Sequence, residues 1–402
     1  MGTLKQNVCL SGGFIMEHIL DFTKTTPKAD VKIFLGDYDG VQRYDRYVYD
    51  SSERMIKVQQ AATWFPREIS YTKDKVGVNS LSPTFQQLYR ENLLFQTIAD
   101  SLANRFLDNM LSGMATSPEW EAILKWQAHF ELLHSESYSW NIREVFVDPE
   151  EFFQEGLKND NIIHRLDLER ETYAKLEQDM ATKWYDRLAP EKALVRKKRA
   201  IFKAAIQQYI LENVRFMVSF LYTLKINHIH DQSLQGSTNS IKLILNDEII
   251  HTVIFANLIN ILRREKNEGF TDILKEDYDT IVKDMFRDVI ASEMDWFYHL
   301  DSIQSIDGFT ADSIRGFLEE IAYTAMSQIG VEDDSLLSVK NEVSIFFNKN
   351  NKINDAKALS QETDLLSYNI ASLEDDEFDH KHMSLSFDEI MDILDGKDPE
   401  WI

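Results

Sequence analysis

The chain has 402 residues, of which 44% are hydrophobic, and its formal net charge is −24 at pH 7. This length can bury a large core, and so acidic a surface repels phosphates, which argues against a nucleic-acid partner. We find no run of about 18 apolar residues and no secretory signal, so we expect no membrane span. The single cysteine excludes an internal disulfide framework and favours a reducing, cytoplasmic location.

The chain divides into three regions by pattern. Residues 1–80 mix short apolar runs with turns and predict a segment that packs on the main body. Residues 81–340 read as long helices, and Ser82-Pro83 and Ser117-Pro118 each place an N-cap residue before a proline at the first helical position. The predicted helices span residues 82–110, 117–145, 162–187, 191–225, 236–264, 270–301 and 310–329. Helices well above the average of about 11 residues favour an all-α bundle over an α/β fold.

The third region, residues 341–402, is rich in Asp and Glu and is typical of a flexible, solvated tail. It nevertheless carries apolar side chains near its end, namely Phe387, Ile390, Met391, Ile393, Leu394, Trp401 and Ile402. Two interpretations remain open. The end is either frayed or a short helix docked on its own domain, or it is a segment that folds onto a partner.

Two Glu-x-x-His pairs, Glu131/His134 and Glu248/His251, lie inside largely apolar helical stretches. Residues three apart share one face of a helix, so both members of each pair can reach one metal ion. Carboxylates and imidazoles are costly to bury on such a face without a partner. Two buried, salt-bridged histidines would be the ordinary alternative, but the repeated spacing favours a metal centre.

A helical di-metal carboxylate site needs one further carboxylate from each of two other helices. Glu212 is a candidate because it is a lone acid in an apolar helical stretch, and Asp100 is a candidate because it lies on the helix before the first Glu-x-x-His pair. Taken singly, either could be a surface or capping residue. Together with the two pairs they make four carboxylates and two imidazoles, a set that suits iron or manganese and does not suit a structural zinc ion.

Tyr138 lies four residues after His134 and therefore joins the same helix face. Phe216, Phe220 and Ile244 lie at helical-turn spacings from the candidate carboxylates on their own helices. Core packing explains these apolar residues equally well. If they surround Tyr138, they form a dry pocket in which a phenoxyl radical is protected from quenching.

These motifs resemble the small, radical-generating subunit of class I ribonucleotide reductase, and the resemblance covers most of the chain. The segments that carry it are residues 96–101, 131–138, 212–216, 219–220 and 247–251. The resemblance implies a ferritin-like helical bundle, a homodimer, and a centre of two iron ions or, alternatively, two manganese ions. The implied ligands are Asp100, Glu131, His134, Glu212, Glu248 and His251. It also implies that the metal pair reacts with oxygen and oxidises Tyr138 to a tyrosyl radical.

The resemblance further implies a partner, the large catalytic subunit, where the radical starts the reduction of ribonucleotides to deoxyribonucleotides. The route to it would begin at Trp64, which Asp247 would join to His134 by hydrogen bonds, and would leave through Tyr368 in the tail. The candidate anchors of the tail on that subunit are Phe387, Trp401 and Ile402. One position departs from the family pattern: Asn246 stands where a basic residue is frequent, and we expect no consequence for metal binding.

Two alternatives compete with this interpretation. Another di-iron carboxylate protein of the same fold, such as a ligand-binding oxidase or a hydroxylase, would share the six ligands. It would not need Tyr138, Trp64 and a tail tyrosine together. A ferritin-type iron store would usually be much shorter and has no use for an acidic tail. The long separation between Glu131 and Glu212 favours the self-assembling di-iron subclass of the reductases.

Overall fold

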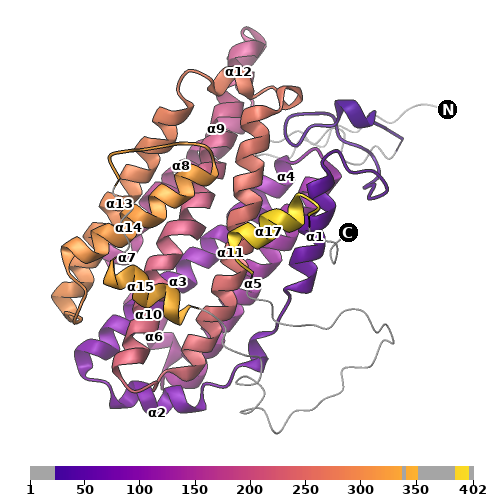
Figure 1. Ribbon diagram of the computed structural model, residues 1–402. Helices are drawn as coiled ribbons and strands as arrows, with labels where there is room; N and C mark the ends of the chain where they lie inside the picture. Colours follow the sequence, from indigo (N-terminus) through magenta and orange to yellow (C-terminus); the bar gives the residue numbers. More distant parts are fainter. Residues whose placement is uncertain (1–22, 337–340, 352–384, 398–402) are drawn as a thin grey trace, which may run out of the picture.

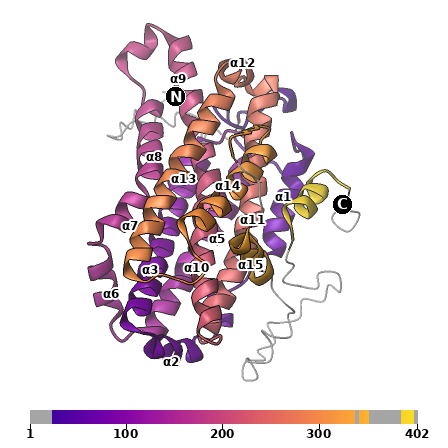
Figure 2. The ribbon, with the colours of Figure 1, turned by 60° about the vertical axis from the view of Figure 1, so that its left-hand side comes forward.

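The computed structural model describes residues 23–336, 341–351 and 385–397. Within these ranges the regular structure is helical, and the only strand-like pairing is an isolated bridge between Phe34 and Ala115. The long helices run side by side in an elongated bundle (Figure 1; Figure 2). The all-α bundle predicted from helix length is therefore confirmed.

Four helices form the centre of the bundle. They are α3 (Pro83–Phe106), α5 (Pro118–Val145), α10 (Phe216–Ile229) and α11 (Gln235–Arg264). Both predicted proline starts are correct. The hydroxyl of Ser82 accepts a hydrogen bond from the amide of Phe85, whereas the side chain of Ser117 makes no capping bond.

The remaining helices cover this centre. The longer ones are α8 (Asp167–Met180), α9 (Pro190–Ile210), α13 (Tyr278–Ile303) and α14 (Ala311–Gln328). The shorter ones are α1 (Asp50–Ala61), α2 (Thr72–Ser80), α4 (Ser112–Met114), α6 (Pro149–Gly156), α7 (Asp160–Arg165), α12 (Thr271–Leu274), α15 (Glu342–Asn350) and α17 (Phe387–Leu394). Among the described residues, α11 is long and apolar enough to cross a membrane, which the sequence analysis did not expect. However, 72% of its apolar window is buried inside the protein, as befits the core helix of a bundle.

Some predicted boundaries are wrong. The helix expected over 162–187 is interrupted at Leu166, where the backbone leaves helical geometry while the side chains of Arg165 and Leu166 both turn into the core, and it ends at Met180. The helix expected over 270–301 is split between α12 and α13. Helix α1 was not predicted because its buried face contains only two apolar residues, Met55 and Val58, beside two polar ones.

Four buried charged side chains tie the outer helices to the centre. Arg165 donates to both carboxylate oxygens of Glu293 at 2.8 and 2.6 Å. Arg215 donates to Glu169 at 2.7 Å and to Glu293 at 2.8 Å. Two guanidinium groups thus balance two carboxylates, without which their burial would be strongly unfavourable. Because Arg215 ends the π-helical turn Leu211–Arg215, this network also holds that turn in place.

Two helices of the acidic C-terminal region pack against the bundle. Helix α15 buries Val343 and Phe347 and lies against α14. Helix α17 buries Ile390, Ile393 and Leu394 and lies across α11 beside α1 (Figure 1). Of the two interpretations of the chain end, the structure therefore shows a short helix on its own domain for residues 387–394.

Candidate metal centre

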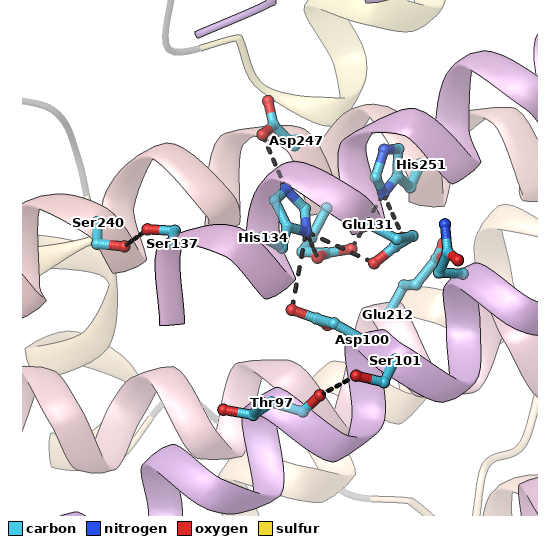
Figure 3. A network of polar contacts seen from close by, with 12 residues as sticks. Thr97, Asp100, Ser101, Glu131, His134, Ser137, Glu212, Ser240, Asp247 and His251 are labelled. Atoms are coloured by element: carbon cyan, nitrogen blue, oxygen red, sulfur yellow. Dashed lines mark hydrogen bonds and ion pairs between the residues drawn. The ribbon is translucent and has the colours of Figure 1, made fainter. Parts of the chain in front are cut away.

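Six buried side chains converge in the middle of the bundle (Figure 3). Helix α3 contributes Asp100, α5 contributes Glu131 and His134, and α11 contributes Glu248 and His251. Glu212 comes from the π-helical turn between α9 and α10. The structure thus brings together all six residues that the sequence singles out as candidate ligands.

Glu131 and Glu248 lie between the two imidazoles. Nδ1 of His134 is 3.5 Å from Oε2 of Glu131 and 3.2 Å from Oε1 of Glu248. Nδ1 of His251 is 3.4 Å from Oε1 of Glu131 and 3.2 Å from Oε2 of Glu248. Each of these carboxylates therefore directs one oxygen toward each histidine, so each could serve as a ligand to two ions, one beside each histidine.

The six residues form two overlapping groups, each able to hold one ion. One group is Asp100, Glu131, His134 and Glu248, and the other is Glu131, Glu212, Glu248 and His251. Within each group the possible ligand atoms all lie within 4.8 Å of one another. Each ion would thus receive three carboxylates and one imidazole. Hard, oxygen-rich donor sets of this kind suit iron and manganese.

The hydrogen bonding of the cluster also fits bound cations. Buried polar atoms are normally paired, yet Oε2 of Glu212 lacks a hydrogen-bond partner among the described residues, and the oxygens of Asp100 and Glu131 face only the two imidazoles and the phenol of Tyr138. Four carboxylates face only two imidazoles. Two divalent ions would supply the positive charge that this buried site lacks, so the residues present fit a di-metal centre.

The pKa values of these groups show the electrostatic cost of the cluster without metal. Burial, followed by the charge of Glu131, raises the pKa of Asp100 well above its ordinary value. Burial and then the charge of Glu248 raise the pKa values of Glu131 and Glu212. Burial opposes ionisation of His134, but its hydrogen bonds to Asp247, Glu131 and Glu248 outweigh that effect and raise its pKa well above the usual value. The cluster therefore retains protons that metal ions would displace.

Asp247 orients His134 from the side of the imidazole that faces away from the cluster. Its Oδ2 lies 3.0 Å from Nε2 of His134 and accepts a hydrogen bond of 2.7 Å from the indole N–H of Trp64. Because the carboxylate accepts from Nε2, Nδ1 of His134 faces the cluster and would offer its lone pair to a metal ion that displaces the Nδ1 proton. Trp64 is buried and follows α1, and its ring is nearly parallel to the imidazole, with centroids 6.3 Å apart. The geometry expected for these three residues is present.

Two glutamines that the sequence analysis missed hold Glu212. Nε2 of Gln127 and Nε2 of Gln208 each donate to Oε1 of Glu212 at 2.6 Å, and Oε1 of Gln208 accepts from the hydroxyl of Tyr173 at 2.5 Å. These bonds occupy one oxygen and leave Oε2 of Glu212 free. Helical spacing offered a weak clue, because Gln208 and Gln127 each precede a candidate ligand by one turn.

Tyr138 is buried, and its hydroxyl interacts with the carboxylate of Asp100. Burial, and then the charges of Asp100 and two glutamates, raise the pKa of Tyr138 well above 10.0, so the phenol is neutral at physiological pH. Phe216, Phe220 and Ile244 are fully buried, and the two phenylalanine rings stack with centroids 5.8 Å apart. The residues expected to form a dry pocket are thus enclosed in the core.

The proposed tail residues are only partly described. Tyr368, Trp401 and Ile402 lie outside the described residues. Phe387 begins α17 and is half-buried. Asn246, the position that departs from the family pattern, accepts a hydrogen bond of 3.3 Å from the amide of Leu385, which directly precedes α17. Its side chain therefore contacts the C-terminal segment.

The chain is similar to proteins of known family. The family model described as "Ribonucleotide reductase, small chain" matches residues 43–333. The ribonucleoside-diphosphate reductase subunit beta of Buchnera aphidicola subsp. Baizongia pistaciae is 27% identical over 312 residues, which cover 74% of this chain and 81% of the relative. The corresponding subunit of Enterobacteria phage T4 is 24% identical over 375 residues, which cover 88% of this chain and 95% of the relative.

Solved structures share the fold. The ribonucleotide reductase R2 subunit from Clostridium botulinum has a TM-score of 0.67 at 20% identity, covering 80% of this chain and 94% of that chain. Dimanganese(II)-NrdF from Streptococcus sanguinis has a TM-score of 0.58 at 17% identity, covering 77% and 99%. The resemblance inferred from the motifs is confirmed: the chain belongs to the small-chain family of ribonucleotide reductase, an oxidoreductase.

Proposed function

We propose that this chain is the small subunit of a ribonucleoside-diphosphate reductase, and that it stores a radical on Tyr138 for delivery to a large catalytic subunit. One observation carries the proposal: a buried tyrosine lies on the same helix as two members of a six-residue carboxylate and imidazole cluster. Bundle proteins that only bind metals need the cluster and do not need the tyrosine. The substrates of the complete enzyme would be ribonucleotides.

The ligands of the proposed centre are Asp100, Glu131, His134, Glu212, Glu248 and His251. We favour two iron ions, with two manganese ions as the alternative, because both metals use the same hard donors. When bound and exposed to oxygen, such a pair supplies the oxidant for a tyrosine. The chain supplies a buried site, two carboxylates that each face both histidines, and a His134 ring that Asp247 holds with Nδ1 facing the cluster.

Tyr138 would lose one electron and its phenolic proton and become a neutral radical. Asp100 is the residue best placed to take the proton, because it is the acid that interacts most strongly with the hydroxyl of Tyr138. The enclosing core keeps out water and reductants. From the centre, the radical would pass through His134, Asp247 and Trp64, and then through Tyr368 to the large subunit, while the electron moves in the opposite direction and restores Tyr138.

A second copy of the chain would complete the assembly as a homodimer in the cytoplasm. Support comes from the outer face of α5, where Leu132 is 56% exposed, and from Phe65, which is 53% exposed and precedes a short turn packed on α5. Large apolar side chains exposed together often mark interfaces. The net charge of −24 gives no support to a nucleic-acid partner.

Metal loading followed by electron paramagnetic resonance tests the proposal directly. Full-length protein is loaded with Fe(II) or Mn(II) under nitrogen, its metal content is measured, and the sample is then exposed to oxygen. We expect two ions per chain and the spectrum of a tyrosyl radical from one of the two loadings. A silent spectrum from fully loaded iron and manganese samples, each also tested with an activating reductant, would contradict the radical function.

The pH dependence of stability should reverse on metal loading. In the metal-free protein the raised pKa values of Asp100, Glu131 and Glu212 mean that the folded state binds more protons than the unfolded state above about pH 4. The raised pKa of His134 extends the same effect above about pH 6.5. The free energy of unfolding of the metal-free protein, and hence its Tm, should therefore fall as the pH rises from 5 to 8.

In the loaded protein, Tm should instead rise over the same interval as far as neutrality, because metal ions bind the deprotonated ligands. At neutral pH, loading should raise Tm by on the order of 5 °C, since ligand at 100 times its Kd adds about 2.7 kcal/mol. Differential scanning calorimetry with and without chelator measures both slopes. Parallel slopes would show that the cluster does not bind metal.

Replacing Asp247 by asparagine should separate radical formation from radical transfer. Asn is nearly isosteric, but its amide cannot accept from both the indole of Trp64 and the imidazole of His134 as well as a carboxylate does. We expect the radical signal to form at a comparable yield and turnover with the large subunit to fall about 100-fold, the upper end for loss of a supporting contact of this kind. Asn246→Asp, at the neighbouring position, is the matched control and should keep turnover near that of the native protein.

A further inference from the structure

The surface against which α17 packs, between α1 and α11, lies next to the outer end of the proposed radical route. Helix α17 packs on α1 and α11. Trp64 follows the end of α1, and Asp247 on α11 is adjacent to Asn246, whose side chain accepts the amide of Leu385 at the start of the α17 segment. The C-terminal helix thus covers the seam between the two elements that present Trp64 and Asp247 (Figure 1; Figure 2).

We propose that α17 is a reversible latch: it occupies the α1–α11 seam in the free small subunit and leaves that seam when the large subunit binds. The inference rests on the proposed function, because it is the delivery of the radical that requires a partner to approach the face bearing Trp64. Under this arrangement the chain protects the start of its own radical route until the correct partner arrives.

The sequence of α17 specifies a helix with both ends capped. Ser386 and Glu389 form a capping box at the N-terminus. At the C-terminus the amide of Lys397 donates to Asp392 O and that of Gly396 donates to Ile393 O, with Gly396 in the left-handed region at φ 70°. Even so, α17 has only eight residues, and an isolated helix below about 12 residues is marginal in water. Its helical state therefore depends on what it packs against.

The attachment to the seam is small and has one polar anchor at each end. Arg54 on α1 donates to the carbonyl of Leu394 from Nε at 2.9 Å and from Nη2 at 2.7 Å, where a cation also complements the negative end of the helix dipole. Asn246 holds the other end. Between these anchors only Ile390, Ile393 and Leu394 are buried. A contact of this size can open without disturbing the bundle.

One apolar face cannot serve two partners at once. Phe387, one of the three residues that the sequence predicts as anchors on the large subunit, lies on α17 and packs against the core of the bundle, so docking of α17 in the seam and docking of Phe387 on the large subunit exclude each other. The apparent affinity for the large subunit should then equal the intrinsic affinity multiplied by the fraction of chains with α17 released.

A substitution in the α1–α11 seam can weaken the docking of α17 there without altering the residues that would bind the large subunit. Arg54→Glu removes both hydrogen bonds to Leu394 and places a negative charge at the carbonyl end of α17, without altering the tail itself. Lys57→Glu is the matched control, because Lys57 lies on the same helix and pairs with Glu53 within α1. Ile393→Asp should also release α17, but unlike Arg54→Glu it places a charge on the apolar face of the helix.

The experiment uses full-length, metal-loaded protein and its cognate large subunit. Hydrogen exchange of the 385–397 peptides reports release of α17, and surface plasmon resonance gives the Kd for the large subunit. For Arg54→Glu we expect exchange to rise about tenfold and the Kd to fall about threefold or more. For Ile393→Asp we expect the same rise in exchange and a weaker Kd, and for Lys57→Glu neither change.

Two results would overturn the latch. One is a released α17 in Arg54→Glu with an unchanged or weaker Kd, because the seam then does not compete with the partner. The other is unchanged exchange in that variant, because Arg54 then does not hold the helix. The native protein distinguishes these failures from failure of the proposed function. If it forms no tyrosyl radical and does not bind the large subunit, the proposed function itself is wrong. If only the latch is wrong, the native protein still forms the radical and still binds the large subunit.

Discussion

The Tyr138→Phe variant should contain the same two metal ions per chain as the native protein and show no tyrosyl radical. The substitution removes only the phenolic oxygen, and the six proposed ligands stay in place. The hydroxyl interacts with Asp100, which would keep a metal ion as its partner in the loaded variant, so the loss of the oxygen should change the free energy of unfolding of the loaded protein little. Turnover with the large subunit should fall to the background of the assay.

Metal analysis, electron paramagnetic resonance and turnover are measured on the same preparations. Tyr222→Phe serves as the control, because Tyr222 is a buried tyrosine on α10 outside the metal cluster, and its signal should match that of the native protein. A radical that persists in Tyr138→Phe and disappears in another tyrosine variant would move the radical to that residue. Loss of metal in Tyr138→Phe would show that the hydroxyl supports the centre itself.

Removing residues 360–402 should abolish turnover and leave the radical signal unchanged. All six proposed ligands and Tyr138 lie in the bundle between residues 100 and 251, outside the deleted segment. The deletion takes away Tyr368, proposed to relay the radical, and α17, proposed to bind the partner. Turnover equal to that of the full chain would disprove any role for the tail.

Two smaller changes separate the relay from the anchor. Tyr368→Phe should bind the large subunit with native affinity and show background turnover, because phenylalanine keeps the aromatic ring and loses the oxidisable hydroxyl. Deleting residues 385–402 should keep Tyr368 and weaken binding instead, so that a high concentration of large subunit restores part of the turnover. If the two variants behave alike, relay and anchor are not separate functions of the tail.

Much of the centre was predictable because helix geometry is local. A spacing of three residues places Glu131 with His134, and Glu248 with His251, on one face of a helix whatever the rest of the chain does. Tyr138 follows from the same periodicity. The cost of burying acids explains why Asp100 and Glu212, isolated in apolar stretches, turned out to face the cluster.

Other features depend on contacts between distant segments. Asp247 lies 183 positions from Trp64, and Gln127 lies 85 positions from Glu212, so no local pattern shows that these side chains meet. The resemblance to the family supplied the first pair, and nothing in the sequence analysis supplied the second. The paired arginines and glutamates that hold the π-helical turn were missed for the same reason.

The chain end shows most clearly what the sequence determined and what it left open. Composition and capping residues specify an amphipathic helix at 387–394, but an apolar helix face is compatible with any complementary surface. Only the tertiary structure selects the α1–α11 seam, because Arg54 and Asn246 meet the two ends of the α17 segment there. The helix was encoded locally, whereas its partner surface is formed by segments that folding brings together.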